Sequence, residues 1–439
     1  MELWLLITLT ISLLVTIAYL LINTTTTKKP KLPPGPPTIL GNITLLRTSM
    51  FDLETTLRHL RSMYGPIFTI HIGFRPMIFI TDRDLAHKVF VRNGAAFADR
   101  PTILSAPYGP RWRLLRRNLM SEVLHPSRVR SHAQSRKWVL RYLADDLMNI
   151  ACSRGGLCVP DQSFRHAMFR LLVCMCFGED LGEGVIKDIE EVEGEIRKRQ
   201  EEVYLPLIEA RKEGGRGLNE REMACLCSEF LAAGADTTST ALQWIMANLV
   251  RDQRVQERIL EEVRSVVGEE AEEVKEEEIQ RMPYVKAVVL EGLRRHPPVH
   301  FLLPHAVSEE VCIEGYVIPK NAMVNFMVAE MGWDEKVWEE PMEFKPERFL
   351  SGGEVAAGVD ITGSREIKMI PFGAGRRICP GMGLALLHLE YFVANLVREF
   401  EWKAAEDEEI DLSEKVEFTV VMKNPFRAKV VPRERVVAQ

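Results

Sequence analysis

The most informative stretch of this sequence reads FGAGRRICPG, from Phe372 to Gly381, and it leads directly into an apolar segment with a helical pattern. It contains one thiol, Cys379, and its glycines let the backbone turn tightly and approach a flat ligand closely. The helix that follows would direct its unpaired N–H groups and the positive end of its dipole at the sulfur, which favours a thiolate. The stretch therefore predicts a cysteine that is presented to a metal.

The composition of the same loop narrows the choice of metal group. Arg377 lies two residues before the thiol and can reach an anionic edge of the same ligand. A thiolate beside a flat, anionic ligand describes a haem iron held by Cys379. The alternative is a buried free cysteine in a glycine-rich turn. The spacing of Phe372, Gly375, Arg377, Cys379 and Gly381 resembles the cysteine-ligand loop of cytochrome P-450 enzymes, and three further motifs favour that interpretation.

The first of these motifs is a pair of opposite charges in the helical pattern that ends near Arg295. Glu291 and Arg294 are three residues apart and therefore share a helix face. Taken alone, they could be a surface ion pair, which contributes little to stability. The resemblance implies instead that Glu291, Arg294 and Arg348 form a buried charge network that fixes the Cys379 loop.

The second motif interrupts a long apolar helical pattern from about residue 223 to 250 with small and polar residues, from Ala233 to Thr238. One explanation is a small-residue packing face with a back-bonded threonine. The resemblance implies that Ala233 and Gly234 leave room for dioxygen in the substrate pocket. It also implies that Thr237 hydrogen-bonds the oxygen and that Asp236 supplies protons through water, a contribution of roughly 10²–10⁴-fold in rate.

The third motif places an aromatic ring and a cation on one helix face, since Trp112 and Arg116 are four residues apart. A basic amphipathic helix is the alternative. The resemblance implies that both side chains contact a haem propionate and that Arg377 and His305 make further carboxylate contacts. It also implies that the substrate pocket is lined in part by three consecutive apolar residues, Phe301, Leu302 and Leu303.

The resemblance extends from Pro33 to the C-terminus and is closest to plant microsomal members, because of the segment from Phe97 to Pro101. It implies a mainly α fold with a small β-rich part. It also implies an NADPH–cytochrome reductase as electron donor, docked by steering on the basic surface of Arg111, Arg113 and Arg117.

The N-terminus has about twenty nearly all-apolar residues, Leu3 to Ile22, which is the length of a membrane-spanning helix. A cleaved signal peptide would have a shorter apolar region with positive residues ahead of it. Lysines follow this stretch, so we expect a single-pass anchor in the endoplasmic reticulum membrane with a cytosolic catalytic domain. Residues 1–22 are then the anchor, residues 23–37 a charged and proline-rich linker, and residues 38–439 the catalytic domain.

Composition excludes other classes of function. A net charge of −6 gives no support to nucleic-acid binding, and the eight cysteines lack the spacing of zinc fingers. The acidic run from Glu261 to Glu278 is expected to be a solvated helix face.

Two intervals are short for the resembled family. Tyr108 comes soon after Pro101, and the interval from Arg116 to Asp236 is reduced where two helices and a loop normally cover the active site. A charged segment, 187–217, stands in their place. Water would enter an uncovered site, and a dry site is part of how oxygen chemistry stays coupled.

The expected function is monooxygenation: one oxygen atom of O2 is inserted into an apolar small molecule, with electrons from NADPH. Two alternatives stay open. One is a catalytically inactive or truncated haem protein of the same family, and the other is a haem-thiolate isomerase or dehydratase that uses no dioxygen.

Overall fold

The computed structural model describes residues 31–38, 41, 53–73, 75–100, 107–153, 155–178, 181–198, 220–353, 359–405 and 408–433. The predicted anchor, Leu3 to Ile22, lies outside these ranges. Within them, no helix is both long enough and apolar enough to cross a bilayer. The division into anchor, linker and catalytic domain stays a prediction.

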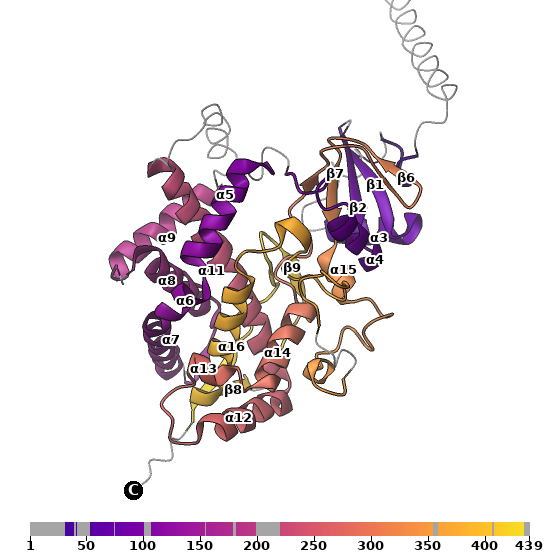
Figure 1. The fold of residues 1–439 in the computed structure, drawn as a ribbon. Coiled ribbons are helices and arrows are strands. Elements are labelled where there is room, and N and C mark those ends of the chain that lie inside the picture. Colours follow the sequence, from indigo (N-terminus) through magenta and orange to yellow (C-terminus); the bar gives the residue numbers. More distant parts are fainter. Residues whose placement is uncertain are drawn as a thin grey trace, which may run out of the picture.

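Most of the described chain is helical, as predicted (Figure 1). Helices α11 and α16 run through the middle of the molecule, and α8 and α14 pack against α11. Their facing apolar side chains form the largest hydrophobic core. The helices of this part are α5 (Pro110–Asn118), α6 (Pro126–Ser131), α7 (Ala133–Ser153), α8 (Asp161–Phe177), α9 (Glu183–Lys198), α11 (Glu220–Arg251), α12 (Gln253–Val267), α13 (Glu276–Ile279), α14 (Pro283–Arg295) and α16 (Met382–Glu399), with a π-helical turn η3 (Leu119–Val123) after α5.

The predicted β-rich part is a separate layer at the upper right of Figure 1. Its main sheet has the strand order β1-β2-β7-β4. The hairpin of β1 (Ile67–Ile72) and β2 (Arg75–Ile80) is antiparallel, whereas β2 pairs in parallel with β7 (Met323–Phe326). The short strand β4 (His305–Ala306) completes the sheet. This sheet therefore joins the N-terminal region to the segment that contains Phe301 and His305.

Short elements complete the fold. The helices beside the main sheet are α3 (Leu53–Tyr64), α4 (Arg83–His87), the π-helical turn η2 (Lys88–Arg92) and α15 (Val328–Gly332). The small sheets contain β3 (Leu157–Cys158), β8 (Phe400–Ala404) and β11 (Ala428–Pro432); β5 (Val311–Ile313) and β6 (Tyr316–Ile318); and β9 (Glu414–Val416) and β10 (Val420–Met422). There are also two 3₁₀ turns, η5 (Pro346–Phe349) and η6 (Gly375–Arg377), and η6 lies within the cysteine loop.

The acidic run from Glu261 to Glu278 is not one solvated helix face. Helix α12 ends at Val267, and Gly268 follows it. The Glu262 carboxylate accepts hydrogen bonds from the backbone N–H groups of Tyr284 and Val285, at 2.8 and 2.9 Å, and so caps α14. Glu276 pairs with the fully buried Arg136 of α7. Both roles follow from partners that are distant in sequence, which a local charge pattern cannot reveal.

The predicted charge network is assembled in the interior. Glu291 and Arg294 of α14 are fully buried and form two hydrogen bonds of 2.7 Å, a side-on bidentate pair through Nε and Nη2 of the arginine. Arg348 of η5 is also buried, and its Nε lies 3.4 Å from Glu291 Oε1. The backbone N–H of Lys345 donates to the same carboxylate oxygen at 2.7 Å.

The arginines of this network also hold backbone carbonyls of the loop that precedes η5. Arg294 donates to the carbonyl oxygens of Gly332 and Pro341, at 2.8 and 2.7 Å, and Arg348 donates to that of Glu340 at 2.9 Å. The Arg294 guanidinium lies 5.3 Å from the ring centroid of Trp338. Through these contacts, one carboxylate organises a long irregular segment.

Trp338 connects this network to the cysteine loop. Its indole N–H donates to the carbonyl of Lys368 at 3.3 Å, and its ring packs with Leu290 and Met369 in a small buried cluster. Leu386 of α16 packs against the same cluster. Met369 is three residues from Phe372. The charge network therefore contacts the segment that leads into the cysteine loop through the side chain of Trp338.

We predict that Glu291→Gln lowers the free energy of unfolding by about 3–5 kcal/mol, because two buried guanidinium groups lose their counter-charge. Chemical denaturation followed by circular dichroism measures the change. The control is Glu347→Gln, which removes a carboxylate from an exposed pair with Arg258 and should change stability by less than about 1 kcal/mol. Equal effects of the two substitutions would contradict a structural role for the buried network.

Candidate functional site

The loop from Phe372 to Cys379 is closed by its own backbone. The N–H of Cys379 donates to the carbonyl of Phe372 at 2.9 Å, and the N–H of Gly373 donates to that of Ile370 at 2.9 Å. Gly373 and Gly375 have φ values of 70° and 69°, a conformation that glycine adopts without strain. A side chain at Gly375 would also meet the Phe90 carbonyl oxygen at 3.1 Å. The glycine spacing is therefore set by the shape of the loop and by its contact with η2.

The Cys379 thiol lies deep in the protein but is not covered by it. The residue is exposed, yet burial raises the pKa of its thiol. Hydrogen bonds from the backbone N–H groups of Gly381 and Met382, at the start of α16, and the charge of Arg116 act in the opposite direction and lower the pKa. A group that is both accessible and surrounded by protein faces open space inside the molecule. The donors around the sulfur are those that an anion requires.

Helix α5 brings to this loop two of the residues that were predicted to contact a propionate. Arg116 Nη2 donates to the carbonyl oxygen of Ile378 at 2.7 Å. The Arg377 guanidinium lies 4.4 Å from the ring centroid of Trp112, and its Nε donates to the carbonyl of Ala98 at 2.7 Å. The structure therefore brings Trp112, Arg116 and Arg377 together around the cysteine.

These cations lie close enough to one another for their charges to interact. Burial lowers the pKa of Arg377 to about 10, with Asp99 acting against that shift and Arg116 adding to it. Burial and the charge of Arg377 also lower the pKa of Arg100 to about 10. An anionic group beside these arginines would relieve the repulsion. The cluster is therefore suited to carboxylates.

Arg100 is a site residue that the sequence did not single out. It donates to the carbonyl oxygens of Leu303 and Pro304, and it lies next to His305. Burial, together with the charge of Arg100, lowers the pKa of His305 to about 3, so this imidazole is neutral at physiological pH. Its Nδ1 lies 2.6 Å from the carbonyl oxygen of Phe97, which fixes the ring as a donor on that side. The one N–H of this neutral ring is therefore given to Phe97 and Nε2 is left as an acceptor, so the predicted contact of His305 with a carboxylate would require a second proton on the ring.

The segment that was expected to line the substrate pocket is extended, so its consecutive side chains diverge. Leu302 packs against the cysteine loop, 3.5 Å from where a side chain on Gly373 would begin. Leu303 is exposed. Phe301 packs instead against the cluster of Phe68 and Phe79 beside the main sheet. The structure thus brings Leu302 to the loop, whereas Phe301 supports the sheet.

Helix α11 presents its small and polar residues on different faces. A side chain on Gly234 would meet Leu172 of α8 at 2.7 Å, so the absence of one lets α8 close on α11. Ala233 is exposed, although it lies in the middle of the helix. Ala233 is therefore accessible, whereas the Cβ direction of Gly234 points at Leu172 of α8, and the expected room for dioxygen stays a prediction. The Thr237 hydroxyl is back-bonded, donating to the Ala233 carbonyl at 2.6 Å.

Asp236 is buried and ion-paired. Arg165 of α8 donates from Nε to Asp236 Oδ1 at 3.0 Å, and its Nη1 pairs with Glu190 of α9. The sequence analysis missed Arg165, although a carboxylate in an apolar helix indicates that a basic partner exists elsewhere. Asp236 is thus linked through one arginine to a third helix.

Helix α9 includes the first part of the charged segment 187–217, which stands in place of the two helices and the loop that normally cover the active site. Its acidic residues face basic residues of α8: Glu183 pairs with Arg170 at 2.7 Å, and Glu190 lies 3.2 Å from His166. Residues 199–219 lie outside the described ranges. The charges of α9 therefore attach this helix to α8 rather than serving only for solvation.

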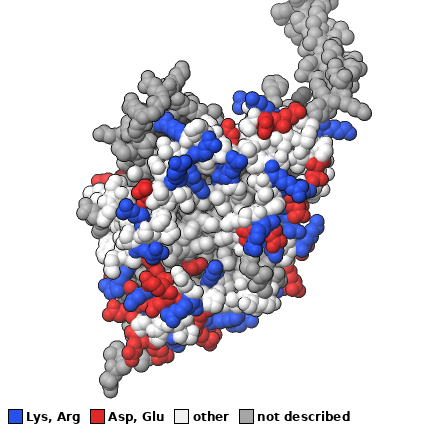
Figure 2. All heavy atoms as spheres, in the orientation of Figure 1, with Lys and Arg blue, Asp and Glu red and all other residues white. Residues whose placement is uncertain are grey.

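Basic side chains gather on the surface over α5. Arg111, Arg113 and Arg117 are exposed, and Figure 2 shows lysines and arginines grouped over this helix. Since Arg116 of the same helix contacts the cysteine loop, the basic surface is adjacent to the candidate site.

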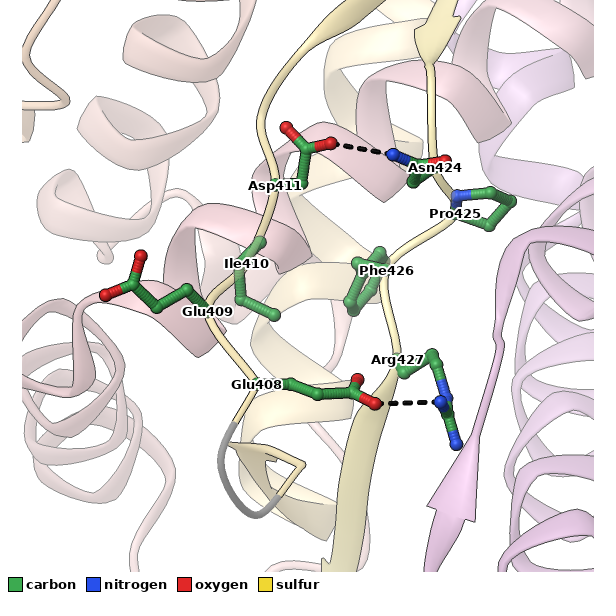
Figure 3. Close-up of a pocket in the computed structure, with 8 residues that line it drawn as sticks. All are labelled: Glu408, Glu409, Ile410, Asp411, Asn424, Pro425, Phe426 and Arg427. Atoms are coloured by element: carbon green, nitrogen blue, oxygen red, sulfur yellow. Dashed lines mark hydrogen bonds and ion pairs between the residues drawn. The ribbon is translucent and has the colours of Figure 1, made fainter.

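A surface pocket of about 390 Å³ lies between two C-terminal segments, 408–411 and 424–427 (Figure 3). Its lining includes none of the predicted site residues. Its polar groups already have partners: Glu408 pairs with Arg427, and Asn424 donates to Asp411, each at 2.8 Å. These contacts join two segments of the chain, and the pocket has no part in the candidate site.

Known proteins provide an independent comparison. A chain of Arabidopsis thaliana, "Cytochrome P450 89A9", is 46% identical over 92% of this chain and 94% of its own length. A "Flavonoid 3'-monooxygenase" of Crocosmia x crocosmiiflora is 30% identical over 95% and 96%. A solved structure of a zebra fish cytochrome P450 with abiraterone superposes with a TM-score of 0.72 at 22% identity, covering 87% of this chain and 99% of that chain. The last similarity supports the fold alone.

The alignments also show that internal segments are missing. The Arabidopsis alignment extends over 483 positions, more than the 439 residues of this chain, so the relative contains segments that this chain lacks. The family model described as "Cytochrome P450" matches two overlapping stretches, residues 30–196 and 185–430, and the overlap falls in α9. The overlap lies in the interval between Arg116 and Asp236, which the sequence analysis found to be short for the family. Together, the family model and these relatives show that the chain belongs to the cytochrome P450 family.

Proposed function

We propose that this protein is a membrane-anchored haem-thiolate monooxygenase that inserts one oxygen atom of O2 into an apolar small molecule. The observation that supports this most directly is the accessible thiol of Cys379, surrounded by backbone donors and by the cations of Arg116 and Arg377. Members of the family use haem with a cysteine thiolate ligand, and the residues in this site suit that cofactor.

The residues fit haem in two respects. The backbone donors at Gly381 and Met382 stabilise a thiolate, and a bound metal ion would remove the thiol proton despite the raised pKa of Cys379. Arg100, Arg116 and Arg377 provide the positive charge that two propionates require, with Trp112 as a further donor. When bound, haem supplies the centre at which dioxygen is activated, and the thiolate favours cleavage of the O–O bond.

The remaining chemistry belongs to α11. Ala233 leaves space on the accessible face of the helix, and Thr237 holds a proton at Oγ1 one turn further along. The Thr237 hydroxyl, now bonded to the Ala233 carbonyl, would be able to rotate and donate its proton on the accessible side of the helix. Asp236 delivers protons through water when its pair with Arg165 opens.

The electron donor is a membrane-bound NADPH–cytochrome reductase, which is steered by the basic surface over α5. The apolar stretch from Leu3 to Ile22 anchors the chain in the endoplasmic reticulum membrane, and the proline-rich segment after it acts as a stiff spacer.

A second candidate function is that of an inactive or truncated haem protein of the same family. The missing internal segments favour it, because they coincide with the helices that exclude water. Purified protein that takes up haem but gives no product with a reductase would support this candidate. Product formation without O2 consumption would support the isomerase or dehydratase.

We predict that Cys379→Ala removes the thiolate-type absorption band of the reduced carbon monoxide complex, because no other sulfur would reach the iron. The spectrum of the purified, reduced protein measures this directly. Cys312→Ala replaces an exposed cysteine on β5 and should leave the band intact. A band that survives in the Cys379 variant would assign the ligand to another residue.

We also predict that Thr237→Ala keeps the haem but raises the hydrogen peroxide released per NADPH consumed, because proton delivery to oxygen becomes disordered. Peroxide and NADPH are measured together in a reconstituted reductase assay. Thr238→Ala, at the buried neighbouring position, should leave the ratio unchanged. If both variants release as little peroxide per NADPH as the unmodified protein, Thr237 has no role in proton delivery.

A further inference from the structure

One face of α11 carries a charged residue that the proposed chemistry does not use. Glu229, Ala233 and Thr237 are spaced by four residues each and therefore follow one another along the same side of the helix. Glu229 and Ala233 are exposed, whereas Leu231, Ala235 and Asp236, on other sides of the helix, are buried. The accessible face that includes Thr237 thus continues for two turns toward the N-terminus and ends at a carboxylate.

The environment of Glu229 matches that of the Cys379 thiol. Glu229 is exposed, yet desolvation by the surrounding protein raises the pKa of its carboxyl group. No neighbouring charge contributes to this shift. Within the described part of the chain, no hydrogen bond or ion pair joins Glu229 to another residue.

A carboxylate in such a position is costly for the folded protein. Glutamine has nearly the same size and would avoid the cost of keeping an unpaired charge away from bulk water. Two other carboxylates have basic partners: the buried Asp236 has Arg165, and the half-buried Glu190 has both Arg165 and His166. Glu229 therefore lacks the internal compensation that the same region of the fold provides for its other acids.

We propose that Glu229 binds a positively charged group of the substrate and so makes this enzyme selective for cationic nitrogen compounds. The inference rests on the proposed monooxygenase function and specifies its substrate class. Eight residues of α-helix between Glu229 and Thr237 correspond to about 12 Å along the axis. Because the carboxylate and the cation each occupy part of that length, the charged nitrogen and the oxidised carbon are expected to be roughly 10 Å apart.

The experiment compares two ligands of the same shape, trimethyl(4-phenylbutyl)ammonium and its carbon isostere (5,5-dimethylhexyl)benzene. Neither can coordinate iron through nitrogen, and the first keeps its charge at every pH. Dissociation constants are measured by equilibrium dialysis and by the shift of the haem absorption band. We expect the cation to bind at least tenfold more tightly, a difference of about 1.4 kcal/mol.

Three variants test the assignment. Glu229→Gln should abolish the preference for the cation and leave the affinity for the carbon isostere within about twofold. Glu229→Asp, which keeps the charge, should retain part of the preference. Glu257→Gln removes an equal charge from an exposed position on α12 and should behave as the unmodified protein. The inference is overturned if the unmodified protein shows no preference or if Glu229→Gln keeps it.

The two levels of the proposal can fail separately, because dialysis requires no turnover. If the protein forms no product but shows a cation preference that depends on Glu229, the proposed role of Glu229 is supported and the proposed monooxygenase function is refuted. If the protein forms product from neutral compounds and binds the two ligands with equal affinity, only the proposed role of Glu229 is refuted.

Discussion

The cost of holding a sulfur anion inside the protein organises this structure. Burial by itself keeps the Cys379 thiol protonated. The start of α16, the glycine loop and the arginine of α5 all act against that tendency at the same atom. Each of these elements needs a rigid position, since a backbone donor that moves by an ångström loses most of its effect. The closed loop, the tryptophan behind it and the buried charge network are the supports that provide this rigidity.

How well the sequence predicted the site depended on the range of each interaction. The cysteine loop and the pair of Glu291 and Arg294 are local patterns, since loop closure and helix spacing place their partners within a few residues. The position of Arg348 required the family resemblance, because its partner is more than fifty residues away. A small β-rich part was predicted, but the parallel pairing of β2 with β7 was not, since it has no local signal.

The residues that the sequence did not reveal have roles that depend on a distant partner, or on the lack of one. Arg100 and Arg165 appear as ordinary surface arginines until the structure places them beside His305 and Asp236. Gly234 depends on a distant partner as well, because its Cβ direction points at helix α8. Glu229 is recognisable only from the combination of helix face and environment, which composition does not contain.

The parallel pairing of β2 with β7 has a consequence for synthesis of the chain. The hairpin of β1 and β2 leaves the ribosome early, but its partner lies far along the sequence, from Met323 to Phe326. At roughly 5–20 residues per second, β2 waits for tens of seconds with an unpaired edge. Exposed strand edges promote association with other chains, so nascent molecules of this protein are expected to depend on chaperones during that interval.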